Sequence, residues 1–115
     1  MNFSGSLPGL LLRLFATHKT DLLADKVASR SRLAVWDRVS HRMHALTGAE
    51  ARGFIRARGV GVIELEMDRL IEEEGAKVAR HRGQIMRDAS ESVIRLVLEQ
   101  AQTSRRSALP MRRAA

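Results

Sequence analysis

The chain has 115 residues, enough for one small domain, and carries 20 basic and 13 acidic residues for a net charge of +7. It contains no cysteine, which excludes disulfide scaffolds, thiol catalysis and thiolate zinc sites, and no apolar run approaches the roughly 20 residues that span a bilayer. We therefore expect a single cytoplasmic domain, residues 1–102, that has no integral membrane segment.

The pattern of helix-breaking residues predicts an all-α fold of four to five helices. The only two prolines, Pro8 and Pro110, lie near the ends of the chain. A first amphipathic helix is expected over residues 6–18, where Ser6 can cap free amides and Pro8 is tolerated in the first turn. Its apolar face repeats at helical spacing and comprises Leu7, Leu10, Leu11, Leu14 and Phe15.

Residues 20–46 are expected to form a helix or a kinked pair of helices. The polar triplet 29–31 is compatible with either a kink or a polar turn of one helix. Beyond it, apolar residues fall on one helical face and polar ones opposite. That apolar face contains Val35, Trp36, Val39, Met43 and Leu46.

A third helix is expected over residues 48–58. Thr47 and Glu50 have the spacing of a capping box, in which each side chain bonds the backbone amide of the other residue. The sequence 59–61, Gly-Val-Gly, predicts the end of this helix because two glycines raise the entropic cost of helix formation.

This segment also resembles a known DNA-binding motif. Leu46-Thr47-Gly48-Ala49-Glu50, followed by Phe54-Ile55 and Gly59-Val60-Gly61, is similar to the opening of helix-turn-helix domains of the response-regulator and sigma-factor kinds. The resemblance implies a helix, a turn and a second helix. The acidic residues Glu66 and Asp68 stand where such domains place the recognition helix, so no base-reading role is assigned.

The remaining sequence predicts a long helix, 61–102, with Gly75 and Gly83 as possible breaks, and a basic disordered tail, 103–115. Because the apolar stripe of this helix is too long for a small domain to bury, we expect it to pair with a second copy in a homodimer. A fold-back at Gly75, with the acidic run 64–74 against following basic residues, is the alternative. The expected oligomerisation residues are Ile63, Met67, Leu70, Val78, Ile85, Ala89, Val93 and Leu96.

The charge pattern suggests a binding function. Residues 30–58 contain seven arginines and two acids, a local charge of +5, whereas residues 64–74 contain six acids and one arginine. We expect a nucleic-acid-binding or nucleoid-associated regulator; the alternatives are an oligomeric adaptor acting through its long C-terminal helix, and membrane-surface contact by helix 6–18. The expected phosphate contacts are Arg30, Arg32, Arg38, Arg42, Arg52, Arg56 and Arg58.

No motif predicts catalysis. Serines are not found in a nucleophile elbow, and no phosphate-binding glycine loop is present. Asp37, His41 and His44 share a helical face at spacings that resemble half of a metal site, but they are interpreted as a solvated surface. We therefore expect a protein that is not an enzyme and that needs no metal or cofactor.

Overall fold

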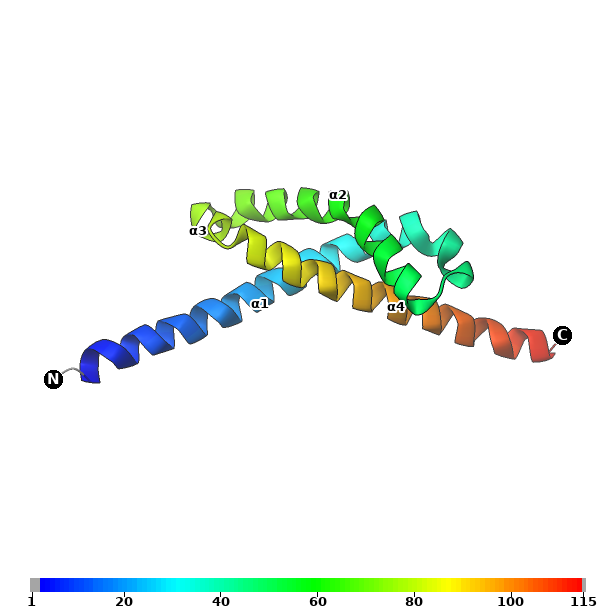
Figure 1. Ribbon diagram of the computed structural model, residues 1–115, viewed down its shortest axis with the longest axis horizontal. Coiled ribbons are helices and arrows are strands. Elements are labelled where there is room, and N and C mark those ends of the chain that lie inside the picture. The colour runs from blue at the N-terminus through cyan, green and yellow to red at the C-terminus, as the bar shows by residue number, and fades with distance from the viewer. Residues whose placement is uncertain (1–2, 115) are drawn as a thin grey trace.

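In the computed structural model, the backbone is described for residues 3–114 and the side chains for residues 18–107. The helices are α1 (Phe3–Val39), the 3-10 helix η1 (Ser40–Ala45), α2 (Gly48–Glu74), the short α3 (Ala76–Ala79) and α4 (Arg82–Ala114). Helices α1, α2 and α4 pack together as an elongated bundle (Figure 1). The predicted all-α fold is confirmed.

The core lies between the three long helices and is largely aliphatic. Each helix directs one stripe of apolar side chains, at helical spacing, toward the other two helices, and these side chains pack together along the bundle. The buried apolar residues include Val27, Val35 and Val39 of α1, Ile55, Met67 and Leu70 of α2, and Ile85, Ala89, Val93 and Val97 of α4.

The first two predicted helices form one continuous helix, α1, so the expected boundary between residues 18 and 20 is wrong. The polar triplet 29–31 does not interrupt it. The buried Ser31 hydroxyl is satisfied within the same helix, since it donates to the carbonyl of Val27 at 2.7 Å. Residues 40–45 leave the α-helical path as η1. The apolar side chains predicted for the face of helix 6–18 lie outside the described side chains.

The capping box at the start of α2 is confirmed. The amide of Glu50 donates to the Thr47 hydroxyl at 3.3 Å, and the amide of Thr47 donates to the Glu50 carboxylate at 2.9 Å. These bonds satisfy amides that a helix start leaves unpaired, and they lower the pKa of Glu50.

The predicted end of this helix at residues 59–61 is wrong, since α2 continues to Glu74. Gly59 is buried, and a Cβ atom there would lie 3.3 Å from both γ carbons of Val35. The glycine permits α1 and α2 to approach closely, and this packing outweighs its poor helix propensity. The turn that the helix-turn-helix resemblance implied is therefore absent from these described residues.

The chain turns back at Gly75, as the fold-back alternative predicts, so residues 61–102 are not one unbroken helix. Gly75 has φ +92° and ψ −173°, and its amide donates to the Ile71 carbonyl at 2.8 Å. Helix α3 follows, and α4 then packs along α1 and α2. Of the eight expected oligomerisation residues, seven are buried within the single chain and Leu96 is half-buried. The stripe that suggested a homodimer is thus internal.

Helix α4 continues beyond residue 102, where the sequence analysis ended it, to Ala114. The Thr103 hydroxyl donates to the Glu99 carbonyl at 3.0 Å, and the Arg105 guanidinium donates to the Met43 carbonyl in η1 at 3.0 Å. The side chains of residues 108–115, within the predicted tail, lie outside the described residues. Among the described residues, no helix combines the length and apolar character needed to cross a bilayer.

Candidate nucleic-acid interface

Arg30, one of the seven predicted phosphate contacts, is paired with a carboxylate of another helix. Its guanidinium donates two hydrogen bonds to Glu73, at 2.8 and 3.0 Å, and Lys26 lies 3.7 Å from both Glu73 and Glu74. The hydrogen bond from Arg30 lowers the pKa of the Glu73 carboxyl group. These contacts join α1 to the C-terminal end of α2, so Arg30 has a structural partner.

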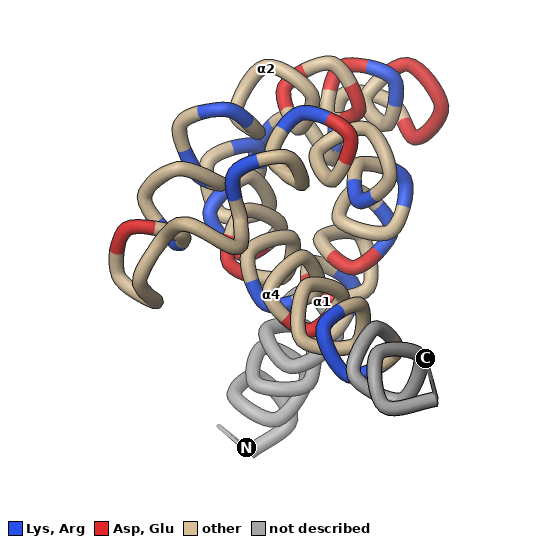
Figure 2. Tube along the Cα trace, turned by 90° about the vertical axis from the view of Figure 1, so that its right-hand side faces the viewer, with Lys and Arg blue, Asp and Glu red and all other residues tan. Residues whose placement is uncertain are grey.

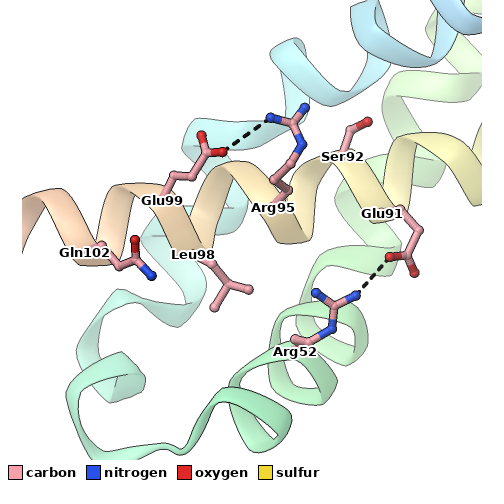
Figure 3. Close-up of a pocket in the computed structure, with 7 residues that line it drawn as sticks. All are labelled: Arg52, Glu91, Ser92, Arg95, Leu98, Glu99 and Gln102. Carbon is pink, nitrogen blue, oxygen red and sulfur yellow. Dashed lines mark hydrogen bonds and ion pairs between the residues drawn. The ribbon is translucent and has the colours of Figure 1, made fainter.

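Arg52 and Arg56 are also paired. Both donate to Glu91 of α4, at 3.0 and 2.8 Å. Arg52 and Glu91 line a groove of about 400 Å³ between α2 and α4 (Figure 3). In the same groove Arg95 lies 3.4 Å from Glu99. Acidic partners for these arginines lie within the groove, which makes it a poor site for an anion.

Arg42 and Arg58 have a different environment, in a surface group that we call the Phe54 cluster: His41, Arg42, Phe54 and Arg58. The guanidinium carbons of Arg42 and Arg58 lie 5.1 and 5.3 Å from the centroid of the Phe54 ring. His41 meets the same ring edge-on, with centroids 6.4 Å apart. Phe54 is half-buried and packs against the core, so the ring is a fixed platform for two exposed cations.

The cations of the Phe54 cluster are not neutralised by ion pairing. Among the described side chains, no carboxylate oxygen lies within 4.0 Å of the guanidinium nitrogens of Arg42 or Arg58. Figure 2 shows basic residues throughout the bundle, with acidic residues concentrated in α2. The acidic run begins at Glu64, more than one helical turn beyond Arg58.

Arg38 reaches α2 at Gly61, about one helical turn beyond Arg58, whereas Arg32 lies elsewhere. Arg38 precedes Arg42 by four residues, and its guanidinium reaches a point 3.9 Å from where a Cβ atom of Gly61 would lie. Arg32 lines a separate hollow between α1 and α4. The seven arginines therefore do not form one surface: three are paired with carboxylates, two lie over Phe54, Arg38 reaches α2 at Gly61, and Arg32 is apart.

Sequence reasoning missed the role of Phe54, which was named only within the helix-turn-helix resemblance. Its spacing from Arg58, four residues on a helix, was a usable signal, because such residues are neighbours on the helix surface. The contact with Arg42 depends on the path of η1 and had no local signal. Asp37, His41 and His44 are exposed, and no group of three metal-binding side chains occurs in the part of the chain whose side chains are described.

Comparison with known proteins does not assign this chain to a family. No family model, curated protein or solved structure matches it. The charges, contacts and exposure of its own residues are therefore what indicate a function.

Proposed function

We propose that this protein binds nucleic acid and contacts phosphates through Arg38, Arg42 and Arg58. The observation that carries the proposal is the Phe54 cluster, in which two exposed guanidinium groups lie over one fixed ring and no carboxylate of the described side chains lies within 4.0 Å of them. Guanidinium groups match phosphate geometry and are more weakly hydrated than ammonium groups, which favours them at such an interface.

The ring contributes by restricting the arginine side chains before binding. A free arginine loses rotamer entropy when a phosphate fixes it, and contact with Phe54 reduces that loss. The contacts proposed here carry no sequence information, because phosphates are the same at every step of a nucleic acid. The proposal is therefore for non-specific, salt-dependent binding, assisted by the net charge of +7.

The test compares two variants that lose the same charge. One is Arg42→Gln with Arg58→Gln, and the other is Arg52→Gln with Arg56→Gln. Fluorescence anisotropy would measure their affinities for a labelled random duplex between about 50 and 200 mM salt, the range over which such binding changes most. Removing two phosphate contacts should reduce the log–log salt slope by about 1.8 for duplex DNA, or about 1.4 for a single strand.

The second variant should change the slope by less than half that amount, because its guanidinium groups already have Glu91 as their partner. Circular dichroism would verify that both variants are folded. Equal losses of slope would show that net charge alone attracts nucleic acid, and absence of binding by the unmodified protein at about 50 mM salt would remove the proposal.

A further inference from the structure

A second site lies at the other end of the bundle from the Phe54 cluster. There α1 meets the helical hairpin, which is formed by α2, α3 and α4 around the turn at Gly75. A cavity of about 150 Å³ there is lined by Lys19, Thr20, Leu23, Lys77, Val78 and His81. The part of α2 from Phe54 to Glu74 spans about 30 Å and separates the two sites. A ligand site in this cavity is therefore independent of the proposed nucleic-acid binding.

The cavity has an apolar floor and a basic rim. Leu23 and Val78 are buried and form the apolar part of its wall, whereas Lys19, Lys77 and His81 are exposed. The rim residues come from two segments far apart in sequence, α1 and the hairpin. The positive φ of Gly75 produces the turn that brings the hairpin residues to α1.

The rim carries uncompensated positive charge. No carboxylate lines the cavity, and neither lysine has a carboxylate oxygen within 4.0 Å of its ammonium group among the described side chains. This differs from Lys26, two helical turns further along α1, which is paired with Glu73 and Glu74. An anionic group at the rim would gain two cationic neighbours without displacing an existing ion pair.

The volume of the cavity limits the size of the ligand that it can hold. A cavity of about 150 Å³ has room for a molecule the size of benzene. Ligand sites of this kind combine an apolar surface with a few convergent polar groups that fix orientation. A ligand with a compact apolar part against Leu23 and Val78, and with one anionic group near Lys19 and Lys77, would contact both the apolar floor and the basic rim.

We propose that this cavity binds a small organic carboxylate with an aromatic or branched apolar body. Benzoate is the probe, benzyl alcohol is its neutral counterpart, and inorganic phosphate is an anion without an apolar body. Nuclear magnetic resonance titration of the full chain should show saturable amide shifts for Thr20, Leu23 and Val78 with benzoate. Benzyl alcohol should bind more weakly, and phosphate should not displace benzoate.

The variants Lys19→Met and Lys77→Met keep an apolar stem but remove the charge, so each should weaken benzoate binding by about two- to fivefold. Arg106→Met is the matched control, since it removes one exposed charge at the opposite end of α4 and should leave affinity unchanged. Thermal melting would verify the fold of each variant. The proposal is overturned by equal binding of benzyl alcohol, by displacement with phosphate, by an equal effect of Arg106→Met, or by no saturable shift at millimolar benzoate.

Discussion

Replacing Gly75 by Ala should destabilise the hairpin, because Gly75 has a backbone conformation that side chains rarely permit. With φ +92° and ψ −173°, it lies in a region occupied almost only by glycine, where other residues cost about 1–3 kcal/mol. Among the described residues, no atom lies within 4 Å of an added Cβ, so the cost comes from the backbone and not from a clash. For a chain of this length, each kcal/mol corresponds to a fall of about 4 °C in melting temperature.

Urea denaturation of Gly75→Ala would measure this loss, with Gly83→Ala as the matched control. Gly83 is helical, has no positive φ and has open space at its Cβ position, so alanine there should be neutral or stabilising by up to about 1 kcal/mol. Light scattering on the same samples would report the mass. If Gly75→Ala were as stable as Gly83→Ala, or if the unmodified chain were a dimer whose melting changed on dilution, the internal hairpin would be refuted.

Other changes test individual contacts. Gly59→Val should lower the free energy of unfolding by about 1–3 kcal/mol through overpacking against Val35, and Val35→Ala should recover part of that loss in a urea double-mutant cycle. Thr47→Ala should cost about 1 kcal/mol by removing the helix cap, measured in the same way. Because Arg30 lowers the folded-state pKa of Glu73, the unmodified protein should have a higher melting temperature than Glu73→Gln at neutral pH. This difference in melting temperature should disappear as the pH falls from above about 4.3, the usual pKa of Glu, through the lower pKa of Glu73 in the folded state. A difference that persisted in acid would contradict the assigned interaction between Arg30 and Glu73.

Local patterns predicted the helical class, the start of α2 and most of the core. Thr47 and Glu50 specify the helix start because both capping bonds are made within four residues. Val35, Val39 and Met43 were expected on one apolar face and all three are buried. These features depend on neighbours in sequence, which is why periodicity and spacing were sufficient.

The features that sequence reasoning missed depend on contacts between distant residues. Gly59 was interpreted as a helix end because its propensity is poor, yet its function in α2 is to make room for Val35, 24 positions earlier. In the fold-back alternative the acidic run 64–74 was expected to meet the basic residues that follow Gly75, but among the described side chains only the Arg82–Asp68 ion pair joins that run to those residues. Glu73 instead binds Arg30 of α1, so a predicted phosphate contact became a structural ion pair.

The relative direction of α1 and α4 has a mechanical consequence. Both helices run the same way along the bundle, and they leave it at opposite ends (Figure 1). A force that pulls the two chain ends apart therefore draws α1 and α4 past each other lengthwise, against the whole buried seam at once. Forced unfolding is governed by the rate of crossing that barrier, so we expect the bundle to resist tension between its termini more strongly than tension that opens the hairpin one turn at a time.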